Sequence, residues 1–289
     1  LLFDIRGFFP EEYTDAGRWK ENGLIYRAVK RVEKWLLKES DGFVILTEKA
    51  REILFPESKE TGEDTHGRPV EVIPCCVDLE RFSNVDQEFR DNFRKTYGLN
   101  ERLVVAYVGA FGGWYLTRET VDFLAAAKRK RPDTFALILT QSPREEVTGL
   151  LTEAGFSDKD YWIGKVRPEE IPNYLSTADF GLSFIKACYS KKSSSPTKNA
   201  EYFAMGLPIL ANSGVGDTAE FTKEDGVGII IEEFDERTYA DALSQMIALL
   251  ESKDTISDAC RKSALKRFDL KQVGGVNYRR IYKKLLEIK

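Results

Sequence analysis

Nine short apolar runs alternate with helix-like segments along this chain of 289 residues, and that alternation limits the possible folds more than any other feature. The runs are residues 2–5, 43–46, 70–73, 103–108, 135–139, 161–163, 180–184, 209–211 and 227–231. The clearest helical segments are residues 117–131, 167–177, 235–250 and 270–288. Strands that alternate with helices form parallel sheets with helices on both faces, so the pattern predicts an α/β fold that is doubly wound.

The most informative segment is residues 193–211, SSSPTKNAEYFAMGLPILA. Ser195 is predicted to cap a helix that starts at Pro196, which would leave the next backbone N–H groups free at the positive end of the helix dipole. A diphosphate can bind at such an end. Thr197 and Glu201 lie four residues apart on one helix face, spanning about 6 Å. A carboxylate accepts hydrogen bonds from both hydroxyls of a diol, so Glu201 suits a ribose. The segment therefore predicts a nucleotide-diphosphate clamp.

This segment resembles the donor-nucleotide segment of GT-B glycosyltransferases of the retaining family four, the glycosyl transferases group 1. Three other stretches resemble the same family in the same order: VIPCCVDLERF at residues 72–82, VVAYVGAFGG at 104–113, and WIGKV followed by ADFGL at 162–182. The resemblance implies a GT-B architecture, in which a doubly wound, Rossmann-like nucleotide-binding domain stands beside a second, here incomplete, Rossmann-like domain. It also implies a retaining glycosyltransferase that moves a sugar from a nucleoside-diphosphate sugar to a saccharide or glycolipid acceptor in polysaccharide biosynthesis.

The resemblance assigns roles to residues of this chain. The residues expected to bind the donor nucleotide are Gly109, Gly112, Gly113, Val166, Ser195, Thr197 and Glu201. Lys198 and Arg118 are expected to stabilise the departing diphosphate as catalytic residues, and no metal or other cofactor is expected. The chain departs from the family at Ser193, where a first glutamate usually precedes the ribose glutamate. It departs also after the glycine loop, where Arg118 is the only basic candidate.

The resemblance also suggests three parts. Residues 1–78 would be a remnant of the amino-terminal, acceptor-side domain, residues 79–268 the nucleotide-sugar-binding domain, and residues 269–289 a closing helix that packs back on the amino-terminal part. The first residues, LLFDIRGFFPEE, resemble a stretch late in the family's amino-terminal domain. We therefore expect a fragment that binds donor but is inactive alone. Two alternatives stay open: a GT-B nucleotide-sugar 2-epimerase, and a nucleotide-sugar-binding module without turnover.

Composition excludes several classes of function. The net charge of -4 argues against nucleic acid as a partner. The single histidine, His66, lies in a polar segment, which argues against a Ser-His-Asp hydrolase. Asp158 and Asp160 match an Asp-x-Asp metal motif but precede a predicted strand instead of following one, so no metal site is predicted. The four cysteines form no C-x-x-C pair, and no apolar run is long enough to span a membrane, so the sequence predicts a cytoplasmic protein.

Residues 18–38 have two readings. The segment carries seven Lys and Arg residues against two glutamates, together with an apolar stripe of Ile25, Val29, Val32 and Leu36 at helical spacing. It is interpreted first as a packed surface helix. The alternative is a patch that meets anionic lipid, which would make the protein peripheral at the inner membrane surface. The sequence gives no sign of an oligomeric state.

Overall fold

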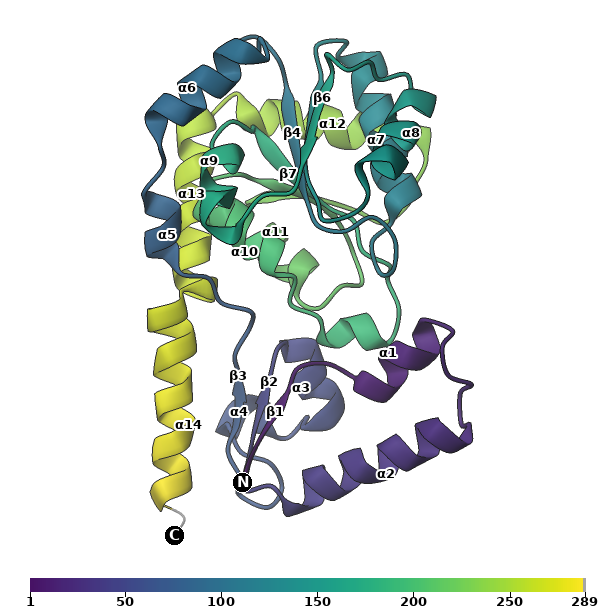
Figure 1. Cartoon of the computed structure of the whole chain (residues 1–289). Helices are drawn as coiled ribbons and strands as arrows, with labels where there is room; N and C mark the ends of the chain where they lie inside the picture. The colour runs from purple at the N-terminus through teal and green to yellow at the C-terminus, as the bar shows by residue number, and fades with distance from the viewer. Residues whose placement is uncertain (288–289) are drawn as a thin grey trace.

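Two parallel sheets, each covered by helices, make up the protein (Figure 1). The computed structural model describes residues 1–287. The smaller sheet has the order β1-β2-β3, with strands β1 (Leu2–Ile5), β2 (Gly42–Ile45) and β3 (Val70–Val72). Around it lie α1 (Phe9–Asp15), α2 (Leu24–Glu39), α3 (Glu48–Leu54), α4 (Ser58–Thr61) and α14 (Val276–Glu287).

The larger sheet has the order β6-β5-β4-β7-β8-β9. Its strands are β4 (Val104–Val108), β5 (Phe135–Leu139), β6 (Tyr161–Gly164), β7 (Phe180–Ser183), β8 (Ile209–Asn212) and β9 (Gly228–Ile231). Its helices are α5 (Leu79–Ser83), α6 (Gln87–Thr96), α7 (Thr117–Lys130), α8 (Arg144–Glu153), α9 (Ile171–Leu175), α10 (Thr197–Ala204), α11 (Thr218–Asp225), α12 (Glu236–Leu250) and α13 (Lys253–Phe268). All neighbouring strands pair in parallel, as the doubly wound prediction requires.

Alternate residues of each central strand enter the two separate cores of the larger sheet. On β4, Val104 and Ala106 belong to the core that α10 and α13 cover, whereas Val105 and Tyr107 belong to the core beneath α7 and α12. Side chains alternate between the two faces of a strand, so a strand that is apolar throughout must be covered on both sides. This explains why the apolar runs of the sequence marked the strands so closely.

Two helical predictions differ from the structure. Residues 167–177 form a 3-10 turn at Pro168–Glu170 followed by the short α9. The first piece begins at Pro168 and Pro172 is the second residue of α9, and neither proline supplies an N–H to continue a preceding turn. Residues 270–288 begin with a π-helical turn at Leu270–Gly275, and regular helix starts only at Val276. Residue 288 lies outside the described residues.

The last helix joins the smaller sheet. Ile281 of α14 is fully buried against Val44 and Ile73, and the Tyr278 hydroxyl donates to Asp4 Oδ2 at 2.7 Å. The first and last described elements, β1 and α14, therefore belong to the same smaller unit (Figure 1). No helix of residues 1–287 is long and apolar enough to cross a membrane.

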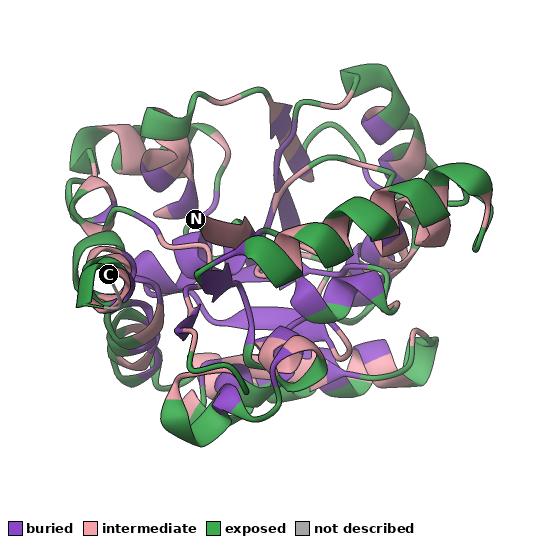
Figure 2. Ribbon diagram, turned by 90° about the horizontal axis from the view of Figure 1, so that it is seen from below, coloured by how far each residue is buried: buried purple, intermediate pink, exposed green. Residues whose placement is uncertain are grey.

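Helix α2 lies on the surface and has no buried residue (Figure 2). Its inner face is held by Lys30, which pairs with Glu11 at 2.9 Å, and by Tyr26, whose hydroxyl donates to Glu11. The apolar surface stripe of α2 is defined here as Leu24, Ile25, Val32 and Trp35, whose exposed fractions are 80%, 59%, 54% and 57%. The reading of this segment as a packed helix therefore holds for one face only.

Candidate functional site

The strand order creates a switch point between β4 and β7. The chain runs from β4 outward to β5 and β6, then returns to the other side of β4 to form β7. The loops that follow β4 and β7 therefore leave the same sheet edge in opposite directions and open a crevice, which is where ligands bind in doubly wound folds. The glycine loop at residues 109–113 and the segment leading into α10 meet at this edge (Figure 1).

The first turn of α10 differs from the prediction. Pro196, with φ -67° and ψ 114°, is the N-cap residue and Thr197 is the first helical residue. Ser195 does not cap the helix, because it lies one residue too early; its Oγ instead accepts the backbone N–H of Cys75 at 3.1 Å. No side chain of residues 1–287 caps this end. The first N–H groups of a helix have no intrahelical acceptor, so those of Thr197 and Lys198 can face an anion.

Tyr202 fixes α10 against the sheet. Its hydroxyl accepts the backbone N–H of Val108 at 2.8 Å and donates to the Leu182 carbonyl at 3.3 Å, so it joins the ends of β4 and β7. The fully buried ring crosses Gly181, where an added Cβ would lie 2.6 Å from the ring. Only glycine permits this close approach. The helix start is thereby held next to the glycine loop.

Lys198 is the buried cation of the site. Its Nζ lies 4.1 Å from the ring centroid of Tyr115 and 4.6 Å from that of Tyr107, and it has no hydrogen-bond partner among residues 1–287. Burial lowers the pKa of Lys198 to about 7, against the opposing effect of Glu201. A buried amine without a hydrogen bond is costly, and perturbed groups of this kind concentrate at functional sites. The arrangement fits an anion that supplies the missing partner.

The glycine loop closes over the Lys198 ammonium. Gly109 has φ +146°, and a Cβ added there would lie 3.0 Å from Lys198 Nζ. Later in the loop, the Gly112 N–H donates to Oγ1 of Thr117 at 2.6 Å, which fixes the loop to the start of α7. The predicted residues Gly109 and Lys198 therefore belong to one site.

Glu201 lies one helical turn further into α10. Its side chain is 11% exposed, and its Oε1 lies 3.3 Å from Nη2 of Arg81 on α5. Burial raises the pKa of Glu201, while Arg81 and Lys198 act in the opposite direction. Thr197, at the start of the same face, is exposed. Arg81 is not among the predicted site residues, although it lies in the stretch at residues 72–82 that resembles the family.

Two other predicted residues lie apart from Lys198. Val166 follows β6, two strands away from β4, and packs partly on the core. Arg118 is the second residue of α7; its side chain is 75% exposed and its Nε donates to Asp122 at 3.1 Å. The structure therefore places Arg118 in a surface ion pair, and its catalytic role stays a prediction.

Ser193, which stands in place of the family's first glutamate, is buried. Its Oγ accepts the backbone N–H of Phe8 at 3.1 Å and donates to the Ser190 carbonyl at 2.8 Å. Thr47 of the smaller unit also contacts this loop, because its hydroxyl donates to the Lys192 carbonyl at 2.8 Å. These bonds tie the loop before α10 to the smaller unit, so the Ser193 hydroxyl is committed to structure and not to a ligand.

The acidic pair at residues 158–160 also has structural partners. Asp160 pairs with Arg102 at 3.0 Å and with Lys128, and Asp158 accepts the Tyr161 hydroxyl at 2.7 Å. Within the described part of the chain, no three Asp, Glu, His or Cys side chains are grouped as metal ligands. That the reaction needs no metal stays a prediction.

The family follows from a direct match. The model of the family described as glycosyl transferases group 1 matches residues 89–263, more than half of the chain, including β4, the glycine loop, Lys198 and Glu201. The chain belongs to this family. Its fold is the GT-B fold, and the matched residues lie in the larger unit and the helices around it.

The individual relatives of this chain within the family have low sequence identity to it. A 2-deoxystreptamine glucosyltransferase of Streptomyces kanamyceticus is 28% identical over 52% of the chain, and an alpha-D-kanosaminyltransferase of the same organism is 21% identical over 87%. The chain spans 38% and 64% of the lengths of these two proteins. The structure of Anabaena HepE in complex with UDP-glucose superposes with a TM-score of 0.72 at 15% identity, covering 99% of this chain and 72% of HepE.

Proposed function

We propose that this protein serves a glycosyltransferase reaction in which a sugar passes from a nucleoside-diphosphate sugar to a saccharide or lipid-linked acceptor with retention of anomeric configuration. The single observation that carries the proposal is the buried, unpartnered ammonium of Lys198 between the glycine loop and the open end of α10. Family membership supports the reaction class, and the UDP-glucose named for HepE makes uridine nucleotides the first donors to test.

In the proposed mechanism the diphosphate of the donor lies against the backbone N–H groups of Thr197 and Lys198 and against the Lys198 ammonium. Negative charge grows on the diphosphate as the sugar–oxygen bond breaks, and preorganised donors stabilise that charge. Glu201, oriented by Arg81, accepts hydrogen bonds from the ribose hydroxyls. The base lies towards Val166 at the end of β6. No step in this scheme requires a metal ion.

One observation favours the alternative of a binding module without turnover. Ser193 stands where a glutamate near the donor sugar is expected from the family resemblance, and its hydroxyl is used by Phe8 and Ser190. The 2-epimerase alternative is less well supported, because such enzymes need acids and histidines near the sugar. The only histidine, His66, is a surface residue with a side chain that is 73% exposed.

Product analysis separates these functions. The chain is incubated with UDP-glucose and a mixture of saccharide acceptors, and the products are followed by NMR. A glycoside that keeps the α configuration of the donor would support the proposal, whereas an inverted product would contradict retention. An epimerised donor would identify an epimerase. Bound but unchanged UDP-glucose is the result expected both of a binding module and of a transferase fragment that is inactive alone.

We also propose that α2 rests on an anionic membrane surface. The apolar surface stripe is flanked along one side of the helix by Arg27, Arg31, Lys34 and Lys38, all of them exposed. A helix with an exposed apolar stripe beside cations is typical of segments that lie in the interface of anionic bilayers. Such a position would suit a lipid-linked acceptor.

Vesicle binding tests this contact. We expect the chain to co-sediment with vesicles that contain anionic lipid and to bind neutral vesicles at least tenfold more weakly, because several cations near the surface contribute about 1 kcal/mol each. Trp35→Glu should abolish binding, while Arg237→Glu, at a side chain on α12 that is 92% exposed, should change it little. Equal binding to both vesicle types, or by both variants, would contradict the proposal.

A further inference from the structure

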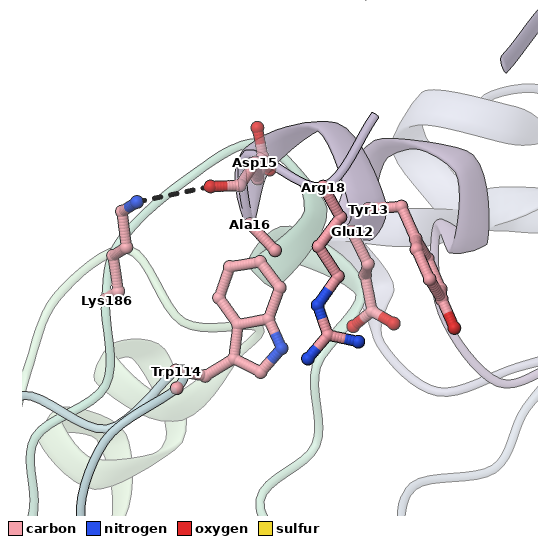
Figure 3. A pocket seen from close by; sticks show the side chains of 8 residues that line it. Glu12, Tyr13, Asp15, Ala16, Arg18, Trp114 and Lys186 are labelled. Carbon is pink, nitrogen blue, oxygen red and sulfur yellow. Dashed lines mark hydrogen bonds between the residues drawn. The ribbon is translucent and has the colours of Figure 1, made fainter. Parts of the chain in front are cut away.

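A cavity of about 410 Å³ lies between α1 and the end of the glycine loop (Figure 3). Its walls include Glu12, Asp15 and Arg18 from the smaller unit and Trp114 and Lys186 from the larger unit. This volume is within the range of about 300–1,000 Å³ that is usual for small-molecule sites. The cavity is therefore large enough for a ligand that is not part of the nucleotide clamp.

The two carboxylates of the cavity already have partners. Glu12 Oε1 accepts from Lys191 Nζ at 2.6 Å, and Asp15 Oδ2 accepts the backbone N–H of Ser190 at 2.9 Å. Both contacts also tie α1 to the 3-10 turn Ser190–Ser193. The negative charges of the wall are thus used to hold the two units together.

The two cations of the cavity lack such partners. Lys186 Nζ donates to the backbone carbonyl of Asp15 at 3.3 Å, and the Arg18 guanidinium lies 5.8 Å from the Tyr13 ring centroid. Neither forms an ion pair within 4.0 Å among residues 1–287. In Figure 3 the Arg18 guanidinium points towards the indole of Trp114. The cavity therefore presents two cations with which no carboxylate of residues 1–287 forms a direct ion pair.

Trp114 supplies an oriented ring. Lys191 Nζ lies 4.1 Å from the centroid of the Trp114 ring, and the Trp114 carbonyl accepts the Lys186 N–H at 2.8 Å. An indole offers a large apolar face with little loss of conformational freedom on binding. The next residue, Tyr115, contacts Lys198. The cavity and the proposed diphosphate site are thus lined by consecutive residues of one segment.

From this juxtaposition we infer that the cavity is an acceptor subsite for a sugar that carries an anionic group, either a carboxylate or a phosphate. Arg18 and Lys186 bind the anionic group, and the Trp114 ring packs against the sugar ring. The inference rests on the proposed function for its assignment to the acceptor; the preference for an anionic sugar is independent of it.

Ligand-observed NMR titration of the whole chain tests the inference with four probes: glucose, glucuronic acid, glucose 6-phosphate and inorganic phosphate. We expect at least one charged sugar to bind tenfold more tightly than glucose and tenfold more tightly than phosphate alone. The better of the two charged sugars identifies a carboxylate or a phosphate as the group recognised. Lys186→Glu and Arg18→Glu should each abolish this preference, whereas Arg237→Glu should keep it.

The outcomes separate the subsite from the nucleotide clamp. Lys186→Glu should leave affinity for UDP within twofold. Equal affinity for glucose and both charged sugars would overturn the subsite, as would phosphate binding as tightly as the better of the two charged sugars. Competitive displacement of the charged sugar by UDP would also overturn it, because the cations would then serve the donor. Retained preference for a charged sugar in a chain that binds no nucleoside diphosphate would contradict the proposed function and not the subsite.

Discussion

Replacing Lys198 by methionine is expected to stabilise the fold and, in the same variant, to remove most of the affinity for a nucleoside diphosphate. Methionine fills a similar space between Tyr107 and Tyr115 without the buried, unpartnered amine. Relief of that amine is worth about 1–3 kcal/mol of unfolding free energy. Loss of its charged contact should weaken UDP binding by about 1.5–3 kcal/mol, roughly 10- to 150-fold.

Lys198 also gives the stability a defined pH dependence. Its pKa in the folded protein is about 7, below the ordinary value of 10.5. Between these two pH values the unfolded chain holds a proton on Lys198 that the folded chain has released. Lys198 therefore makes the free energy of unfolding rise with pH across this window, and below pH 7 it contributes no pH dependence. Diphosphate prefers the charged amine, so UDP affinity should fall as the pH rises above 7.

Urea unfolding and calorimetry at pH 6, 7, 8 and 9 measure both effects. The wild-type chain and Lys198→Met should differ in slope between pH 7 and 9, with the variant lacking the Lys198 contribution. A variant that is less stable than the wild type and binds UDP equally well would show that Lys198 supports packing alone.

Glu201→Gln should weaken UDP binding by about 1.5–3 kcal/mol, because the charged acceptor for the ribose hydroxyls is lost. Glutamine keeps the volume of the side chain beside Arg81, so the fold should survive. The comparison ligand is 2′-deoxy-UDP, which lacks one of the two hydroxyls. The substitution should affect it less than UDP, as measured by calorimetry. Equal losses for the two ligands, or none, would exclude Glu201 as the ribose acceptor.

The sheet could be predicted from sequence because its strands are buried on both faces. Such strands have continuous apolar sequences, so the predicted bounds of β4 and β5 nearly equal the observed ones. The GT-B architecture was predicted from the family resemblance. Helix boundaries were less predictable. The prolines at 168 and 172 divide one predicted helix into two short pieces, and a serine before a proline can be read as a cap even when the proline takes that position.

The site was only partly predictable, for a related reason. Lys198 and Glu201 lie on one helix, so their proximity follows from helical spacing. The residues that surround Lys198 and Glu201 come from segments that are remote in sequence. Tyr107 and Tyr115 surround the Lys198 amine, and Arg81 reaches Glu201 across 120 residues. No local pattern predicts these contacts, nor does one predict that Ser193 would bond to Phe8 in the smaller unit.

The measurement that tests the central claim most directly is a calorimetric titration of the chain with UDP, UMP and uridine. If Lys198 and the open end of α10 form a diphosphate site, affinity should increase from uridine to UDP by at least tenfold, about 1.4 kcal/mol. The increase should fall by roughly tenfold or more in Lys198→Met, which keeps the backbone N–H groups, while uridine binding is kept. Equal affinity for uridine and UDP in the wild-type chain, or an undiminished preference for UDP in Lys198→Met, would contradict the account.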